Sequence, residues 1–284
     1  MISFDWAMKR LLRSKANYEV LEGFLSELLR RKIVIKNLIE SESNKSKSND
    51  KSNRVDILVE ADDREMIIIE LQNDSENDYF QRMLYGTSKI ITEYINEGDK
   101  YSTVRKVYSI NIVYFDLGKG NDYIYHGTAK FTGLHNPNDE LQLSARQKKL
   151  YEKTVPADLY PEYYIIKVKN FDDVAKDTLD EWIYYLKNNK IKDVFTAKGL
   201  VKAMKVLAFD NLTDAEKNDY WRHVEDRRIK DSEMETAFED GRAKEQENTV
   251  LNSYRAGIPI ETISIITALT PDQITEILKR HGLI

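Results

Sequence analysis

The chain has 284 residues, of which 41% are hydrophobic and none is cysteine. The lack of cysteine excludes disulfides, thiolate metal sites and a cysteine nucleophile, and the formal net charge of -5 gives no overall sign of nucleic-acid binding. No apolar run approaches the length of a membrane helix and no secretion signal is recognisable, so we expect a globular protein of the reducing cytoplasm.

The first stretch predicts helices followed by a strand. Apolar residues recur at helical spacing between residues 4 and 32, and IVIKNLI (33–39) has the composition of a short strand. Residues 41–52 are polar and low in complexity, which is typical of a surface loop. Residues 1–55 hold twelve lysines and arginines against seven acids. A basic face is permitted here, although such a charge run is usually only solvated surface.

A β-hairpin is predicted next, because RVDILVE (54–60) and REMIIIELQ (64–72) are strand-like and a short acidic turn separates them. A helix is predicted over 78–98, where Gly98 ends it. Further strands are predicted over 104–118, 123–131 and 163–170. This order of helix, strands, helix and strands indicates an α/β or α+β sheet domain that ends near residue 170.

From Phe171 onward the pattern is helical, with helices predicted over 172–189, 196–209 and 213–257. Two short helices follow, and Thr270 and Pro271 have the residue types of an N-cap and a first helical position. We therefore divide the chain into a sheet domain (1–170), a helical extension (171–250) and a small helical tail (251–284). The tail could oligomerise or form a helix-turn-helix. Oligomerisation is favoured, because the last helix carries only Lys279 and Arg280 as basic residues.

Two carboxylates of the predicted hairpin carry the chemistry. Glu70 and Gln72 share one face of their strand, since side chains alternate. If the hairpin closes between Ala61 and Glu65, Asp56 lies across from Glu70. Two anions at cross-strand distance repel each other, and a hard divalent cation removes that repulsion. The alternative is an ordinary structural role, in which both acids face water at strand ends or pair with Arg54, Arg82 or Lys89.

The pattern Asp56, thirteen residues, then Glu70-x-Gln72 resembles the PD-(D/E)XK phosphodiesterase superfamily. FDWAMKRLL, RVDILVE, IIIELQ and QRMLYGTSKI, together with DGRAKE and RAGIPIETISIITALTPDQITEIL, resemble one branch of it, the recombination-promoting nucleases described as PD-(D/E)XK nuclease family transposases. The resemblance covers roughly residues 3–117 and 240–280. It implies a restriction-endonuclease-like mixed sheet flanked by helices, with an α-helical C-terminal region.

The resemblance also implies roles for the hairpin residues. Asp56 and Glu70 would bind the metal, and the backbone carbonyl of Leu71 would complete the protein's contacts with it. Gln72 stands where the superfamily usually has lysine, so it could orient the attacking water but could not supply positive charge. Val55 stands in place of the nominal motif's proline, which is a common departure.

The helix after the hairpin carries Gln81 and Tyr85, the spacing Q-x-x-x-Y that lines the active site in several DNA-processing branches. Lys89 continues that face one turn later and could supply the charge that Gln72 lacks. The plain alternative is that Tyr85 packs while the other two are merely exposed. Asp5 and Glu22 are weaker candidates for a third acidic contact.

The leading hypothesis is therefore a Mg²⁺-dependent DNA endonuclease, in which Mn²⁺ could replace Mg²⁺ and DNA is the partner. A homodimer is expected, because a concerted double-strand cut needs two active sites. The alternative is a catalytically weak DNA-binding or regulatory assembly protein built on a nuclease fold. Loss of cleavage without metal, or on substitution of Asp56, would distinguish the enzyme from the binder.

Overall fold

The computed structural model describes residues 6–7, 15–39, 56–62 and 64–284. The chain divides into two compact units, with the boundary between Thr213 and Asp214. In the described residues, the first unit contains the sheet and the second contains helices only.

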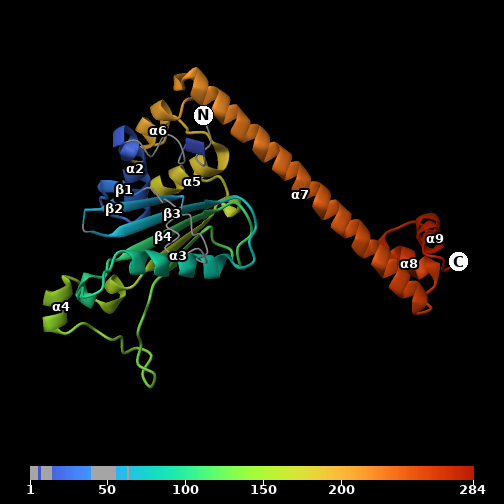
Figure 1. Cartoon of the computed structure of the whole chain (residues 1–284), viewed down its shortest axis with the longest axis horizontal. Helices are drawn as coiled ribbons and strands as arrows, with labels where there is room; N and C mark the ends of the chain where they lie inside the picture. The colour runs from blue at the N-terminus through green and yellow to red at the C-terminus, as the bar shows by residue number, and fades with distance from the viewer. Residues whose placement is uncertain (1–5, 8–14, 40–55, 63) are drawn as a thin grey trace. The chain divides into compact units, whose positions relative to one another are not determined.

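The first unit is built on a six-stranded mixed sheet in the order β1-β2-β3-β4-β6-β5 (Figure 1). The strands β1, β2 and β3 pair antiparallel, β3, β4 and β6 pair parallel, and β5 pairs antiparallel with β6. Their bounds are β1 (Ile35–Ile39), β2 (Ile57–Ala61), β3 (Met66–Gln72), β4 (Val107–Val113), β5 (Ile124–Gly127) and β6 (Glu162–Lys167). The predicted mixed sheet with flanking helices is confirmed.

The strand β3 is strongly apolar, and six of its seven residues are buried. Such a run is expected of a strand that is covered on both faces. Figure 1 shows α3 (Tyr79–Glu93) on one side of the sheet and α2 (Tyr18–Leu28), α5 (Thr178–Asn188) and α6 (Leu200–Val206) on the other. The sheet is therefore the middle layer of three.

The helices α5 and α6 lie beyond residue 170 but pack on α2 of the sheet unit. The rings of Phe24 and Trp182 meet edge to face, with 5.7 Å between their centroids. Gly23 permits this approach, because a Cβ there would overlap the backbone of Lys198 and Gly199. The structure thus groups residues 171–213 with the sheet, whereas the division predicted from sequence falls near residue 170.

Shorter helical elements fill the connections. The helix α4 (Ala145–Tyr151) begins with a capping box, in which Ser144 and Gln147 satisfy each other's backbone N–H groups. This helix was not predicted from the sequence, although Ser-x-x-Gln is the signal of a capping box. The single turns are η1 (Lys15–Asn17), η2 (Tyr101–Thr103), η3 (Pro156–Leu159), η4 (Val168–Asn170) and η5 (Phe209–Asn211).

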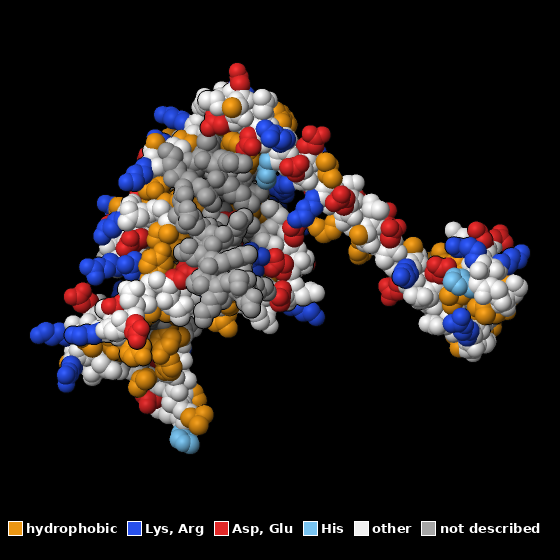
Figure 2. All heavy atoms as spheres, viewed as in Figure 1, with side chains coloured by type: hydrophobic (Ala, Val, Ile, Leu, Met, Phe, Trp, Pro, Cys, Tyr) orange, Lys and Arg blue, Asp and Glu red, His pale blue; other side chains and the backbone are white. Residues whose placement is uncertain are grey.

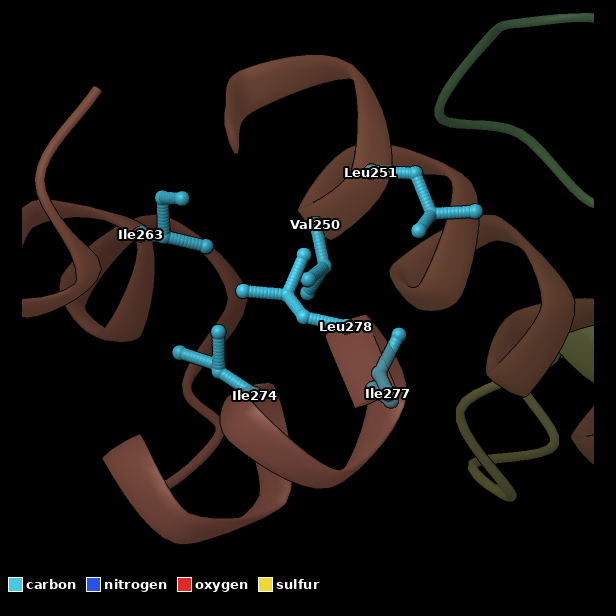
Figure 3. Packing of buried hydrophobic residues seen from close by; sticks show 6 residues of the cluster. All are labelled: Val250, Leu251, Ile263, Ile274, Ile277 and Leu278. Carbon is cyan, nitrogen blue, oxygen red and sulfur yellow. The ribbon is translucent and has the colours of Figure 1, made fainter. Parts of the chain in front are cut away.

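The second unit consists of α7 (Asp214–Arg255), α8 (Ile260–Thr267) and α9 (Pro271–Arg280). Gly257 after α7 has a φ of +78°, and Thr270 caps α9 through a capping box, as the sequence predicted. Among the described residues, no helix is long and apolar enough to cross a membrane. The end of α7 forms a small core with α8 and α9 (Figure 3), made of Val250, Leu251, Ile263, Ile274, Ile277 and Leu278.

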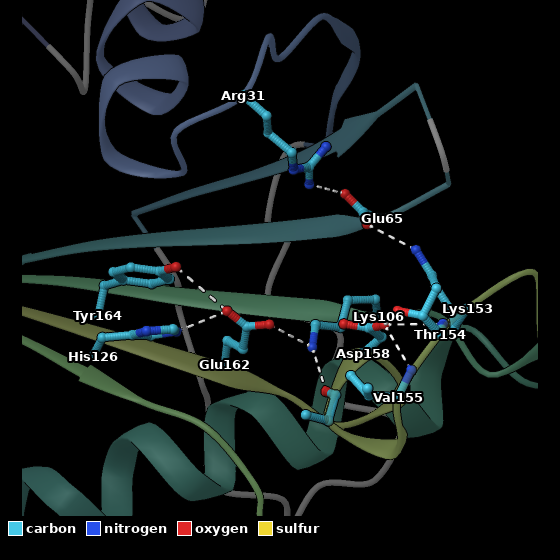
Figure 4. A network of polar contacts seen from close by, with 11 residues as sticks. Arg31, Glu65, Lys106, His126, Lys153, Thr154, Val155, Asp158, Glu162 and Tyr164 are labelled. Atoms are coloured by element: carbon cyan, nitrogen blue, oxygen red, sulfur yellow. Dashed lines mark hydrogen bonds and ion pairs between the residues drawn. The ribbon is translucent and has the colours of Figure 1, made fainter. Parts of the chain in front are cut away.

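A charged network lies at the ends of the sheet strands where β3, β4 and β6 begin (Figure 4). The buried carboxylate of Glu65 contacts both Arg31 and Lys153. Glu162 contacts Lys106 and His126, each at 2.8 Å. Burial alone would raise the pKa of Glu162, but its hydrogen bonds with Lys106 and His126 lower that pKa below its usual value. In this network Glu65 and Glu162 each meet two basic groups, whereas Asp158 accepts hydrogen bonds from Thr154 and Val155.

Candidate active site

The hairpin closes in the register that the sequence predicted. Ile57 pairs with Ile69 and Leu58 pairs with Ile68, so one further step places Asp56 opposite Glu70. Asp56 itself lies just before β2, and its Oδ2 accepts a 2.8 Å hydrogen bond from the backbone N–H of Leu71. This bond ties the start of β2 to the end of β3 and holds one carboxylate beside the other strand.

Glu70 lies beneath α3, where its residue is only 8% exposed. Its partner across the parallel β3–β4 pair is Asn111, which is fully buried. Tyr79 of α3 donates its hydroxyl to Asn111 Oδ1 at 3.2 Å, and Asn111 in turn donates to the Ser109 hydroxyl at 3.0 Å. A polar chain therefore runs beside Glu70 through an otherwise apolar layer, which is a costly arrangement unless each member is satisfied.

Arg82 is the cation nearest to Glu70 in the described part of the chain. Its guanidinium lies 3.5 Å from Glu70 Oε2 and 2.6 Å from Glu76 Oε1. Burial alone would lower the pKa of Arg82, but Glu70 first and then Glu76 raise it, so the guanidinium stays charged. The ion pair that the sequence analysis held open for Glu70 and Arg82 is thus present. The Glu70–Arg82 ion pair is long, and Glu76 lies closer to Arg82 than Glu70 does.

The amide of Gln72 is oriented by Glu76. Its Nε2 donates to Glu76 Oε1 at 2.8 Å and to the carbonyl oxygen of Asp74 at 3.3 Å. Because both partners can only accept, the nitrogen must face them. The acceptor Oε1 of Gln72 is then the atom left to face elsewhere. Gln72 is therefore arranged here as an acceptor, unlike the lysine usual at this position.

The charged groups around the site shift the pKa of the Tyr79 phenol. Burial raises the pKa of Tyr79 far above its usual value, and the negative charge of Glu70 raises it further. Arg82 opposes this effect, while Asp56 and Glu76 add to it. Tyr79 therefore stays a neutral hydrogen-bond donor, and three carboxylates act electrostatically on the same buried ring.

The predicted DNA-contacting residues lie along α3. The residues of α3 that face the sheet are Tyr79, Met83, Gly86, Thr87 and Ile90. Gln81 and Tyr85 are exposed instead, and Lys89 lies 3.8 Å from Glu93. DNA contact by Gln81, Tyr85 and Lys89 stays a prediction. It is Arg82, one residue after Gln81, that reaches the carboxylates.

The two weaker acidic candidates have different outcomes. Glu22 of α2 accepts a 2.8 Å hydrogen bond from the backbone N–H of Ile35, so its carboxylate orients the start of β1. Asp5 lies outside the residues that the structure describes. Sequence reasoning did not select Glu76 or Asn111. Glu76 lies in an irregular segment without periodicity, whereas Asn111 could be noticed as a lone amide within the strand VYSINIV.

The donor set suits a small, hard cation. No group of three or more histidines, cysteines, aspartates or glutamates in the described residues could hold a metal ion. Mg²⁺ needs no such group, because one or two carboxylates with waters and phosphate oxygens are its usual ligands. Asp56 and Glu70 on adjacent strands, with the backbone of Leu71 between them, fit that requirement.

Comparison with known proteins identifies the family. A family model described as PD-(D/E)XK nuclease family transposase matches residues 2–237. No curated protein and no solved structure matches the chain. The matched residues include the hairpin, the whole sheet and α3. Because the match spans most of its length, this chain belongs to the PD-(D/E)XK nuclease family transposases, which supports a nuclease-type function.

Proposed function

We propose that this chain is a Mg²⁺-dependent DNA endonuclease that hydrolyses phosphodiester bonds. The observation that carries the proposal is the hairpin register, which brings Asp56 opposite Glu70 beneath a helix that carries Arg82. Two carboxylates on adjacent strands form a pair of oxygen ligands that one divalent cation can bind.

The residues that would hold Mg²⁺ are Asp56 and Glu70, through their carboxylates, and Leu71, through its backbone carbonyl. When bound, the cation supplies charge stabilisation at the scissile phosphate and lowers the pKa of a water molecule. The hydrogen bond from the Leu71 N–H fixes Asp56 Oδ2, so the position of this carboxylate is set before any ligand arrives. Mn²⁺ should substitute for Mg²⁺, since it accepts similar oxygen ligands.

Gln72 is proposed to orient the attacking water. With its Nε2 held by Glu76, Gln72 offers Oε1 as an acceptor for one of the water's protons. That hydrogen bond leaves a lone pair of the water oxygen directed at phosphorus. Gln72 cannot supply the positive charge that a lysine would place beside the phosphate, so another residue must supply it.

Arg82 is proposed to supply that positive charge. Its guanidinium already lies between Glu70 and Glu76, and it can turn from Glu70 toward a phosphate oxygen without leaving Glu76. A planar guanidinium suits phosphate oxygens, and its charge is worth most where charge develops in the transition state. Lys89 is the second candidate for this role, as the sequence suggested.

DNA would lie along the outer part of α3, where Gln81, Tyr85 and Lys89 are the proposed contacts. The basic residues of segment 1–55 would add sequence-independent phosphate contacts that weaken with salt. A homodimer is proposed because cutting both strands together needs two active sites.

The second candidate function is a catalytically weak DNA-binding or assembly protein.

Plasmid cleavage tests the proposal. Wild-type protein should nick or cut plasmid with Mg²⁺ or Mn²⁺ and not with EDTA. The informative variant is Asp56→Asn, because asparagine keeps an acceptor for the Leu71 N–H but loses the ligand charge. Asp62→Asn is the matched control, since Asp62 is an exposed acid at the opposite end of the same hairpin.

Loss of cleavage in Asp56→Asn with full activity in Asp62→Asn would support the enzyme. Equal cleavage by both variants would show that the metal site is elsewhere. DNA binding that is unchanged by EDTA and by Asp56→Asn, without cleavage under any metal, would instead favour the binding protein.

A further inference from the structure

The long helix α7 carries apolar side chains that nothing in its own unit covers. All side chains from residue 228 to residue 245 are exposed. Among them, Met234 is 47% exposed and Phe238 is 72% exposed. Figure 2 shows hydrophobic side chains at intervals along this helix, between acidic ones. A helix that is polar almost all round needs an additional source of stability.

Four of the apolar residues of α7 follow a heptad pattern, and two of these, Tyr220 and Val224, are half-buried. The exposed Trp221 and Ile229 lie outside the pattern. Alternate steps of four and three residues place six side chains on one seam, which are Tyr220, Val224, Arg227, Asp231, Met234 and Phe238. This spacing is that of the a and d positions of a coiled coil, and it spans about 27 Å of helix. The four apolar members lie at the two ends of the seam, and the two charged members lie at its centre.

The seam is complementary to itself when reversed. If a second copy runs antiparallel, with the twofold axis level with Ile229, Val224 lies opposite Met234 and Tyr220 lies opposite Phe238. Arg227 then lies opposite Asp231. We infer that α7 pairs with α7 of a second copy of this chain as an antiparallel coiled coil along this seam. A twofold interface requires this kind of self-complementarity.

The charged centre fixes the register of the pairing. Two symmetry-related contacts between Arg227 and Asp231 form at the axis, and a slip by one heptad breaks both of them. Arg227 and Asp231 also lie four residues apart on one helix. A base that precedes its acid is the weaker order for such an intrahelical pair. A polar layer that specifies register costs stability but excludes alternatives.

Charge also selects the antiparallel direction. Residues 231–240 contain five acids and no base. A parallel pair would place this acidic segment against its own copy, where like charges destabilise the dimer. In the antiparallel pair it faces residues 218–227, which contain three acids and two bases. The interface rests on α7 alone and does not depend on the proposed nuclease activity.

Charge reversal of the full-length protein tests the inference. Sedimentation velocity over a concentration series should show a dimer for the wild type. Arg227→Asp and Asp231→Arg should each weaken dimerisation by about tenfold or more, because each creates like-charge contacts at the axis. The double variant R227D/D231R should restore the dimer. Arg222→Asp is the matched control, since position 222 lies outside the seam, and it should dimerise like the wild type.

A monomeric wild type would overturn the inference. So would single variants that dimerise normally, or a double variant no better than the single ones.

Cysteine crosslinking tests the direction of pairing. The chain has no cysteine, so single introduced thiols report without background. Under mild oxidation, Val224→Cys mixed with Met234→Cys should form a mixed disulfide, because these positions face each other. Val224→Cys alone should crosslink poorly, since its two copies lie about 15 Å apart along the axis. Efficient crosslinking of Val224→Cys with itself would show a parallel pair and overturn the antiparallel one.

Discussion

The two ends of the central sheet use charge in opposite ways. Where β3, β4 and β6 begin, Glu65 and Glu162 each contact two basic groups. Where β3 ends, Arg82 is one guanidinium that contacts two carboxylates, Glu70 and Glu76. At the first end each of these two acids is shared between two basic partners, and at the second end one base is shared between two acids.

This difference separates stability from function within one sheet. At the first end, hydrogen bonds with Lys106 and His126 lower the pKa of Glu162, and the two acids fix the positions of strands and loops. At the second end, Glu70 lies beside Asp56 of the neighbouring strand, and this is where we propose that a metal ion binds. Substitutions at the first end should therefore lower stability, and substitutions at the second end should lower activity.

The largest effect is expected for Glu70→Gln. Loss of one ligand charge should reduce metal-dependent plasmid cleavage by about a thousandfold. Because Arg82 keeps Glu76 as its closer partner, the free energy of unfolding should change by less than about 1 kcal/mol. Initial cleavage rates and urea unfolding of the same preparation measure both. A large loss of stability would mean that Glu70 has a structural role. It would contradict the expectation that substitutions at this end of the sheet lower activity without lowering stability.

Glu162→Gln should lower the stability of the protein and leave its cleavage activity unchanged, the opposite of Glu70→Gln. Removing this charge leaves the buried ammonium group of Lys106 without its ion-pair partner, so the free energy of unfolding should fall by about 3 kcal/mol. Cleavage per folded molecule should not change. Urea titrations monitored by circular dichroism, paired with plasmid cleavage, measure these two quantities.

The pH dependence of the same variant checks the cause. The pKa of Glu162 is lower in the folded protein, so its contribution is complete above the unfolded pKa and is lost as the pH falls through the folded pKa. Glu162→Gln should therefore lose less stability than the wild type on acidification in that range. Equal acid sensitivity of the two proteins would assign the effect to other carboxylates.

Arg82→Gln should have an intermediate effect on catalysis. Loss of the guanidinium should lower the cleavage rate by about a hundredfold, because its charge is then missing in the transition state. Arg82→Lys should recover part of this loss, since lysine restores the charge but not the planar geometry. DNA affinity in Ca²⁺, which supports binding without rapid cleavage, should change little. A fall in affinity as large as the fall in rate would make Arg82 a binding residue instead.

The smallest effect is expected for Lys89→Ala. DNA affinity should fall by about threefold at moderate salt, and the slope of affinity against salt should decrease by about one ion. Lys130→Ala is the matched control, because Lys130 is an exposed lysine paired with Glu140 outside α3. Fluorescence anisotropy with labelled duplex DNA over a salt series measures both. Equal losses for the two variants would indicate a general charge effect without a binding face on α3.

Much of this site could be predicted from sequence because the hairpin obeys local rules. Strand alternation and a short turn determine that Asp56 lies opposite Glu70, and both signals are contained within seventeen residues, 56–72. The role of Glu76 could not be predicted, since its contacts depend on how an irregular segment folds back over Gln72.

Arg82 shows a different limit of sequence reasoning. Helical spacing predicts that Gln81, Tyr85 and Lys89 share one face, but spacing alone does not say which face of α3 meets the sheet. That choice depends on Tyr79, Met83 and Ile90 packing against β3 and β4, which is a tertiary effect. Rotation of the helix by one residue decides whether residue 81 or residue 82 reaches Glu70. Similarly, the packing of α5 on α2 placed the unit boundary beyond residue 170.

The bond between Asp56 and the Leu71 N–H has a consequence for changes in chain length. A residue added or removed within β2 or β3 would reverse the facing of every side chain beyond it and separate the two carboxylates. The connection between Ala61 and Glu65 lies at the far end of the hairpin from this bond. Insertions there leave the paired residues in place, so a peptide tag or fluorescent label should be tolerated at the turn and should leave the catalytic end undisturbed.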